Sequence, residues 1–258
     1  MNSLSLGFVG GGRVTRFLLE GFRRGGAQFS QAIVSDPAPK VMELLKRSLP
    51  GLPIREGGPA EVSQASILFI AVHPPAYEAV LASVRPHVRK DSVVVSLAPK
   101  VTISAITQAL GGFGRIVRMI PNAPSIICQG YNPICFSTGL PELERKTLRE
   151  LFNLLGHSPE VPESHLEAYA IVAAMGPTYL WFQLEELKRL GIEFGLPEPE
   201  AAGAVSAMAE GALHTLFKSG LRADEVMDLI PVRPLASCEE AIRNMYRQAL
   251  EPLYARLK

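Results

Sequence analysis

Three consecutive glycines lie near the N-terminus, after an apolar segment and before residues with helical spacing. Gly10 permits a tight turn, and Gly12 allows a ligand to come close to the backbone. The N–H groups at the start of the following helix favour an anion, and a pyrophosphate fits them. Although Thr15 stands where the dinucleotide fingerprint usually has Gly or Ala, the pattern favours a dinucleotide site over an ordinary glycine turn. The residues predicted to bind the pyrophosphate half are Gly10, Gly11, Gly12, Arg13 and Val14.

An acidic residue, Asp36, follows Ser35 at the end of the second apolar run. A carboxylate at this place can accept hydrogen bonds from the ribose hydroxyls of an adenosine and repels a 2′-phosphate. No arginine occurs between it and Arg47, although Lys40 could reach a phosphate if the loop curls back. The charges therefore slightly favour NAD(H) over NADP(H), with Ser35 and Asp36 as binding residues. A helix N-cap is the structural alternative for Asp36, and it is compatible with binding.

Three later strand ends complete the predicted cleft, because ligands of open α/β sheets lie beyond the carboxyl ends of the strands. They are Ala71-Val72-His73-Pro74, Ser96-Leu97-Ala98-Pro99 and Pro121-Asn122-Ala123-Pro124. The residues predicted to contact the nicotinamide half are Ala71, Val72, His73, Pro74, Ala98 and Asn122. His73 could act as a general acid, or it could simply flank the cofactor.

Short apolar runs that alternate with helical patterns position these residues. The predicted strands are Leu4–Val9, Ala32–Ser35, Ile67–Val72, Ser92–Ser96 and Ile116–Met119, with a further strand possible at Ile134–Phe136. Nearly continuous apolar strands between helices favour a parallel sheet covered on both faces. We expect an α/β, doubly wound Rossmann domain over residues 1–161.

The chain from 162 to 258 is predicted to form an all-α domain. The segment Glu198–Phe217 is rich in small and apolar residues, and a helix without a polar face is usually buried on several sides. An inter-subunit interface could bury it, which predicts a homodimer through the C-terminal helices. A last helix is expected after Ser237 as N-cap, ended or kinked near Glu251 by Pro252.

The composition excludes several classes of protein. The chain has 258 residues, of which 47% are hydrophobic and 20% charged, so it can bury a core. A net charge of +1 gives no reason to expect nucleic acid or an acidic membrane as partner. The longest uncharged run, Ala168–Leu184, is short for a membrane span and is interpreted as a buried helix pair. No targeting segment is recognisable, which predicts a cytoplasmic protein.

The three cysteines are Cys128, Cys135 and Cys238, which form neither a CxxC pair nor an even set. We expect them to be small buried hydrophobic residues rather than ligands of a metal or partners in a disulfide.

The order of the motifs GFVGGGRV, AVHPP, SLAPKVT, VRMIPNAPS, GPTY and GIEFGLP resembles the pyrroline-5-carboxylate reductase family. The resemblance implies an N-terminal domain that binds NAD(P)H, a helical domain that forms an intertwined dimer, and an active site between them. It implies hydride transfer to the C=N carbon of a small imino acid, most simply 1-pyrroline-5-carboxylate, with proline as the product. It implies no metal, because an iminium is already electrophilic and the dinucleotide carries the chemistry.

Three departures from the family pattern concern the substrate. Ala173-Ala174-Met175 replaces the family's serine-rich approach to Gly176-Pro177, and Ala207-Met208 replaces its Gln-Thr pair. The family's Ser-Pro-Gly-Gly-Thr-Thr loop has become residues 231–236, which contain two prolines and so lack two N–H donors. Each polar group of the substrate left unpaired costs about 1–3 kcal/mol.

The residues that the resemblance places near the substrate are Asn122, Met175, Gly176, Pro177 and Arg233. Arg233 could bind a carboxylate with two hydrogen bonds, or it could be a solvated surface arginine. Tyr179 could donate a proton, but such a tyrosine is more often a core residue.

Two other functions stay open. The first is a dinucleotide-binding sensor or partner protein whose catalysis is impaired, because the substrate motifs differ while the glycine turn is intact. The second is an enzyme resembling the β-hydroxyacid dehydrogenases, which usually rely on a lysine of the helical domain. The long helix here offers only Lys188 for that role.

Overall fold

The computed structural model describes residues 4–258, and the chain divides into two compact units. The first runs to Ala174 and includes Arg256–Lys258 of the C-terminus. The second comprises Met175–Ala255. Nowhere in the described part of the chain is a helix both long and apolar enough to cross a bilayer.

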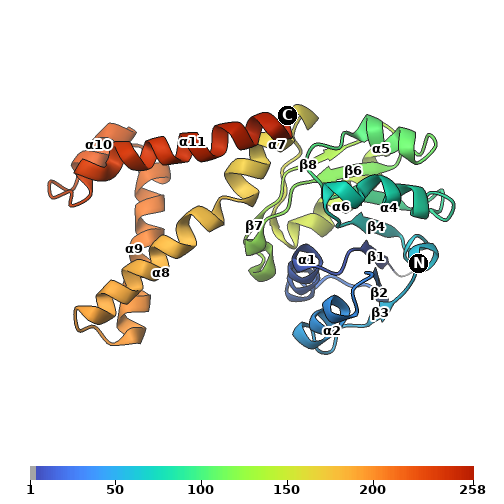
Figure 1. Ribbon diagram of the computed structural model, residues 1–258, viewed down its shortest axis with the longest axis horizontal. Coiled ribbons are helices and arrows are strands. Elements are labelled where there is room, and N and C mark those ends of the chain that lie inside the picture. Colours follow the sequence, from blue (N-terminus) through green and yellow to red (C-terminus); the bar gives the residue numbers. More distant parts are fainter. Residues whose placement is uncertain (1–3) are drawn as a thin grey trace. The chain divides into compact units, whose positions relative to one another are not determined.

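The first unit contains the doubly wound parallel sheet that the sequence predicts (Figure 1). Its strands are β1 (Ser5–Val9), β2 (Gln31–Ser35), β3 (Ile54–Glu56), β4 (Ile67–Ile70), β5 (Val93–Ser96), β6 (Ile116–Met119) and β8 (Ile134–Phe136). They lie in the order β3-β2-β1-β4-β5-β6-β8, and all neighbours are parallel except β6 and β8. A small separate sheet pairs β7 (Gly130–Tyr131) with β9 (Gly156–His157). From β1 the chain first adds β2 and β3 on one side and then crosses over to add β4, β5 and β6 on the other. This change in strand order between β1 and β4 leaves a crevice beyond the carboxyl ends of the strands, where such folds bind ligands.

Helices cover both faces of the sheet. One face carries α1 (Arg13–Arg24), α2 (Pro39–Ser48) and α6 (Glu142–Asn153), and the other carries α3 (Pro59–Val62), α4 (Tyr77–Val84) and α5 (Ile103–Ala109). The period of two along β1 explains this arrangement, since Leu6 and Phe8 join one core and Val9 joins the other. Phe8 stacks on Phe69 of β4 with ring centroids 4.6 Å apart.

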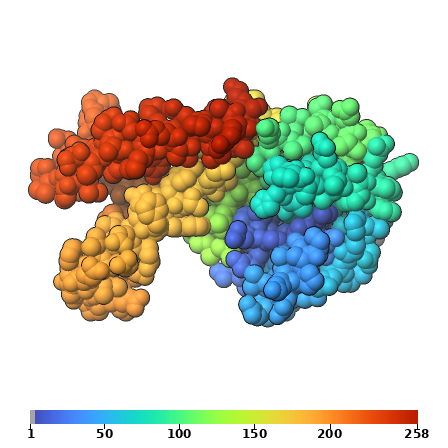
Figure 2. All heavy atoms as spheres, in the orientation of Figure 1, coloured from blue at the N-terminus to red at the C-terminus, as the bar shows by residue number. Residues whose placement is uncertain are grey.

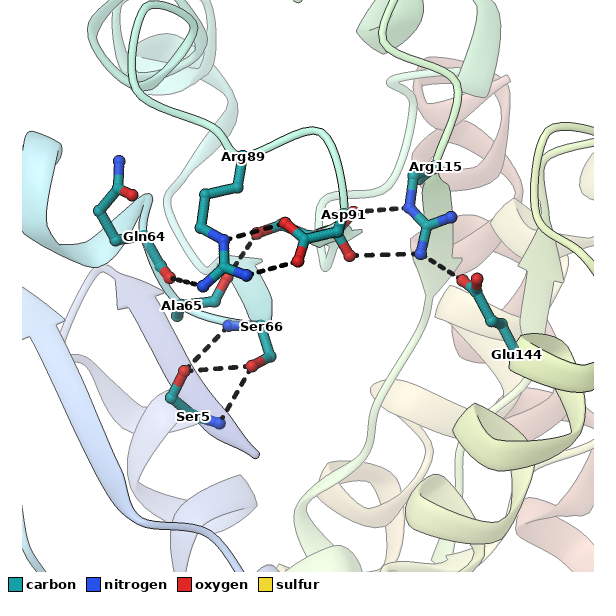
Figure 3. A network of polar contacts seen from close by, with 9 residues as sticks. Ser5, Gln64, Ala65, Ser66, Arg89, Asp91, Arg115 and Glu144 are labelled. Atoms are coloured by element: carbon teal, nitrogen blue, oxygen red, sulfur yellow. Dashed lines mark hydrogen bonds and ion pairs between the residues drawn. The ribbon is translucent and has the colours of Figure 1, made fainter. Parts of the chain in front are cut away.

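Polar side chains join the amino ends of the strands (Figure 3). Ser5 Oγ accepts a hydrogen bond of 3.0 Å from the N–H of Ser66, which precedes β4. Arg115, which precedes β6, donates to the carbonyl oxygen of Asp91 at 3.2 Å and pairs with Glu144 of α6. The polar groups at the amino ends of the strands therefore bind one another. A ligand site is expected at the carboxyl ends.

The end of the first unit is a succession of short helical turns. They are η3 (Glu163–His165), α7 (Leu166–Tyr169) and the π-helical η4 (Ala170–Ala174). Leu166 and Ala170 are buried against Ile120, which follows β6. This contact explains why the first unit continues to Ala174.

The second unit is entirely helical, as predicted. Its elements are α8 (Pro177–Glu193), α9 (Glu198–Lys218), α10 (Ala223–Asp228), the short η5 (Ala236–Cys238) and α11 (Glu239–Leu257), whose last residues belong to the first unit. Figure 2 draws the atoms of this unit as spheres, coloured from yellow-orange to red along the chain. Between Met175 and Ala255, all of which is described, only Ala201 is buried.

Three expectations about helices and burial were wrong, and a fourth was wrong in part. Ser237 is not an N-cap but lies inside η5, and α11 begins at Glu239. Of the two outcomes predicted for Pro252, an end of the helix is contradicted, because α11 continues to Leu257, and a kink near Glu251 stays a prediction. The run Ala168–Leu184 is not buried throughout, since Trp181 is 52% exposed. The cysteines are not buried either, and Cys238 is exposed.

Candidate functional site

A cavity of about 570 Å³ lies beyond the carboxyl ends of β1, β4 and β5. Its lining residues come from the glycine turn, α1, α2 and the loops after β4 and β5: Gly11, Gly12, Arg13, Val14, Arg16, Val41, Leu44, Leu45, Ala71, Val72, His73, Pro74, Leu97, Ala98 and Pro99. Most of the residues predicted for the cofactor therefore line one cavity. We call it the main groove.

The glycine turn brings the backbone close to its neighbours at Gly10. This residue has a φ of 98°, which favours glycine, and a Cβ there would lie 2.4 Å from the carbonyl oxygen of Ala71. Gly10 N–H donates to the carbonyl oxygen of Ser35 at 2.8 Å, which links the end of β2 to the turn. A Cβ on Gly12 would meet nothing within 4 Å, so the space beside this backbone is open to a ligand.

Thr15 fixes the turn from inside α1. Its side chain is fully buried, and Oγ1 donates a hydrogen bond of 2.5 Å to the carbonyl oxygen of Gly10. The departure from the usual fingerprint thus adds a polar contact that the sequence did not predict.

Two arginines of α1 line the main groove. Arg13 opens the helix, and Arg16 lies three residues later on the same face. Within residues 4–258 neither guanidinium forms an ion pair, and the first turn of α1 holds no acidic residue. Together with the helix dipole they make this end of the groove suited to an anion such as a pyrophosphate.

Asp36 lines a second cavity of about 330 Å³, together with Val34, Pro39, Met42, Glu56 and Gly57. Its Oδ2 accepts a hydrogen bond of 2.8 Å from Gly11 N–H, and its Oδ1 accepts one of 2.9 Å from Ala38 N–H. Ala38, and not Asp36, is the N-cap residue of α2. The bond to Gly11 joins the wall of this cavity, which we call the acidic cavity, to the glycine turn.

His73 and Asn122 occupy different surroundings. His73 is exposed at the edge of the main groove. Asn122 is 7% exposed, its Oδ1 accepts from Tyr131 N–H at 2.9 Å, and its Nδ2 donates to the carbonyl oxygen of Ala173 at 3.3 Å. Both polar groups of the Asn122 side chain are thus engaged with the backbone, and the residue is absent from the described lining of the main groove.

A buried ion-pair cluster holds the loop after β5. Arg118 of β6 is 1% exposed and donates to Glu167 at 2.7 Å and to Glu163 at 3.1 Å. Glu167 also accepts from Lys100 N–H, and Glu163 accepts from Ile103 N–H at 2.6 Å. Burial acts to raise the pKa of Glu167, but the hydrogen bond and charge of Arg118 outweigh it and lower that pKa. The cluster fixes the segment that directly follows the groove wall.

The substrate residues predicted in the second unit are Met175, Gly176, Pro177 and Arg233, and Tyr179 is a candidate proton donor there. Gly176 is the N-cap of α8, and Pro177 is its first residue. The ring of Tyr179 packs edge-on against that of Tyr246 with centroids 5.8 Å apart, and partial burial raises the pKa of the phenol.

Arg233 forms an ion pair with Glu239 and lines a cavity of about 350 Å³. The same carboxyl group lies 3.9 Å from Arg243, which lines this cavity with Met227 and Ile242. Arg233 is therefore not a free surface cation.

Four groove residues were missed at the sequence level. Arg16 could have been found from its spacing to Arg13, since residues three apart share a helix face. The α2 residues Val41, Leu44 and Leu45 gave only a helical period, and nothing in it pointed to a ligand.

Comparisons with known proteins agree with this geometry. Residues 5–100 match the family described as NADP oxidoreductase coenzyme F420-dependent. Pyrroline-5-carboxylate reductase 3 of Xenopus laevis is 30% identical over 230 residues, which cover 86% of this chain and 82% of that protein. The chain belongs to the pyrroline-5-carboxylate reductase family. Membership confirms the resemblance predicted from the motifs, and it makes the chain an NAD(P)-dependent oxidoreductase.

Other members of the pyrroline-5-carboxylate reductase family match most of the chain. The reductase of Methanosarcina acetivorans is 24% identical over 97% of this chain and 95% of that protein. The crystal structure of Plasmodium falciparum pyrroline carboxylate reductase with NADP bound gives a TM-score of 0.84 at 20% identity, covering 100% of this chain and 97% of that one. The Streptococcus pyogenes enzyme gives 0.74 at 18% identity, covering 99% and 95%. These structures confirm the predicted fold.

Proposed function

We propose that the protein uses a reduced nicotinamide dinucleotide to reduce the C=N bond of a small imino acid, with 1-pyrroline-5-carboxylate as the first candidate and proline as its product. The observation that carries the proposal is the main groove, where the glycine turn, Arg13 and the loops after β4 and β5 meet. Family membership supports the choice of reaction.

The residues present fit a dinucleotide. When bound, the cofactor supplies the hydride that reduces the imine carbon. Gly12 leaves space beside the backbone, and the start of α1 with Arg13 attracts a pyrophosphate. Ala71–Pro74 and Ala98 shape the wall on which the nicotinamide half would lie. The protein's contribution is then orientation, since the chemistry needs no metal.

We further propose that NAD(H) is preferred over NADP(H). Asp36 presents a carboxylate to the acidic cavity, where an adenosine ribose would be bound next to the glycine turn. That carboxylate accepts from ribose hydroxyls and repels a 2′-phosphate.

We also propose roles for three residues in binding the substrate. Arg233 would have to exchange Glu239 for the substrate carboxylate, with Arg243 beside it. A phenol keeps its proton at neutral pH, and for Tyr179 we propose a role as hydrogen-bond donor to the substrate. For Asn122 we propose a positioning role, through Ala173, on the segment that leads to Met175, Gly176 and Pro177.

A homodimer through the second unit is part of the proposal. Large apolar side chains are exposed on α8 and α9 and directly after α8, among them Trp181, Phe182, Phe217 and Phe194. Patches of this kind on a soluble protein usually mark an interface, and a second copy of the unit would bury them.

The alternative function is a dinucleotide-binding sensor with impaired catalysis. The pairing of Arg233 with Glu239, in the loop that lacks the family's Ser and Thr donors, favours it. A titration with NADH and NADPH, followed by 1-pyrroline-5-carboxylate in the same cuvette, separates the two. Binding with oxidation supports the reductase, binding without oxidation supports the sensor, and no binding of either nucleotide overturns both.

A further inference from the structure

Glu56 shares the wall of the acidic cavity with Asp36. It ends β3 and pairs in register with Val34 of β2, two residues before Asp36. Side chains of paired residues in a parallel sheet project to the same face, and so do side chains two residues apart along a strand. Both residues line the acidic cavity, Glu56 at the end of β3 and Asp36 directly after β2.

Lys46 of α2 is the partner of Glu56. Its Nζ lies 2.9 Å from Oε1 of Glu56, and the two side chains are 48% and 57% exposed. An ion pair with this exposure contributes little to stability. Loss of the Glu56 carboxylate therefore leaves the Lys46 ammonium free to move. Lys46 itself is not among the residues that line the acidic cavity.

We propose that Glu56 is a second specificity-determining residue, which disfavours a 2′-phosphate by its own charge and by holding Lys46 away from the cavity. The inference rests on the proposed function, in which this cavity takes the adenosine ribose of the cofactor. Asp36 binds the ribose hydroxyls, whereas Glu56 acts only against the phosphate. A ribose without the phosphate brings no charge, so Glu56 leaves its binding unchanged.

The size of the effect follows from the charges. A 2′-phosphate carries close to two negative charges, and one carboxylate a few ångströms away in a hydrated cavity weakens its binding about tenfold. Loss of Glu56 removes this repulsion and frees a cation that can pair with the phosphate. The preference for NADH over NADPH then depends on Glu56 and Lys46 together.

The test measures the dissociation constants of NADH and NADPH by fluorescence titration. The variants are Glu56→Gln, Glu56→Gln with Lys46→Met, Lys46→Met alone, and Glu43→Gln as control. Glu43 is an exposed acid of α2 that lines neither cavity, so it reports any general effect of a lost negative charge.

We expect Glu56→Gln to tighten NADPH binding about tenfold and to leave NADH within about twofold, and the added Lys46→Met to reduce the gain to about threefold. The gain should shrink at high salt. An unchanged ratio in Glu56→Gln, or an equal change in Glu43→Gln, overturns the inference while the proposed function stands. A gain that persists undiminished in the double variant overturns the role of Lys46. If the unaltered protein binds neither nucleotide, the proposed function itself fails.

Discussion

The buried hydroxyl of Thr15 donates to the carbonyl oxygen of Gly10, and so ties the first turn of α1 to the glycine turn before it. Thr15→Val keeps the volume but removes the donor, so we expect a loss of about 1–2 kcal/mol in unfolding free energy and weaker NADH binding. Urea denaturation and a fluorescence titration measure the two effects. Thr147→Val is the matched control, because the Thr147 hydroxyl also donates to a helix carbonyl but is exposed. Equal effects of the two substitutions would contradict the role given to Thr15.

Gly10→Ala should abolish dinucleotide binding. The substitution combines a positive φ with a Cβ placed 2.4 Å from the Ala71 carbonyl oxygen, so the turn must move. Gly26→Ala separates these causes, since Gly26 has a φ of 78° but open space around it. We expect the control to be destabilised by about 1 kcal/mol and to bind NADH normally. Isothermal titration calorimetry with NADH measures binding by both variants. Normal binding by Gly10→Ala would mean that the pyrophosphate does not bind at the glycine turn.

Glu20 should make stability depend on acid pH. Hydrogen bonds from Arg23 and Arg24 outweigh burial and lower its pKa from 4.5 to about 2. Because the folded-state pKa lies below the unfolded one, the stabilisation is complete above about pH 4.5 and is lost as the pH falls towards 2. Both arginines are half-exposed, so we expect about 1–2 kcal/mol. Thermal unfolding of Glu20→Gln between pH 2 and 7 should show a flatter profile in that window; a profile parallel to that of the unaltered protein would contradict this.

Arg118→Met should destabilise the first unit strongly. The change leaves the carboxylate of Glu167, whose side chain is 11% exposed, without its cation, which typically costs about 3–5 kcal/mol for a buried pair. Glu163 also loses its cation, but it is 33% exposed and adds little to this cost. Arg149→Met is the control, because Arg149 also meets two carboxylates but is 32% exposed. Chemical denaturation should separate the two variants by at least about 2 kcal/mol. Similar losses would mean that the burial of Arg118 does not matter.

Phe217→Glu should disrupt the proposed dimer. Phe217 is 76% exposed near the end of α9, and a carboxylate there is costly to bury in an apolar interface. Sedimentation velocity should give the mass of one chain for this variant and twice that mass for the unaltered protein. Lys218→Glu places the same charge one residue away and should stay dimeric. A dimeric Phe217→Glu variant would exclude this part of α9 from the interface.

The sequence predicted what depends on local pattern. Apolar runs located six of the seven strands described in the main sheet, and β3 was missed because Ile54–Glu56 has a single apolar residue at the sheet edge. The glycine turn and Asp36 were found because their chemistry has a fixed spacing. Glu56 was not predicted from the sequence, because its place beside Asp36 depends on the register of β3 with β2, which a local sequence pattern does not reveal. From the sequence alone Arg118 would be expected at the surface, because its partners Glu163 and Glu167 are distant along the chain.

Of the described residues of the second unit, only Ala201 is buried, so this unit has almost no interior of its own. A helical array without an interior of its own gains most of its stability when another molecule covers it. If that molecule is a second copy, the midpoint of thermal unfolding rises with protein concentration, as mass action requires. In that case dilution alone lowers the stability of this chain, whereas the stability of a monomer does not depend on protein concentration.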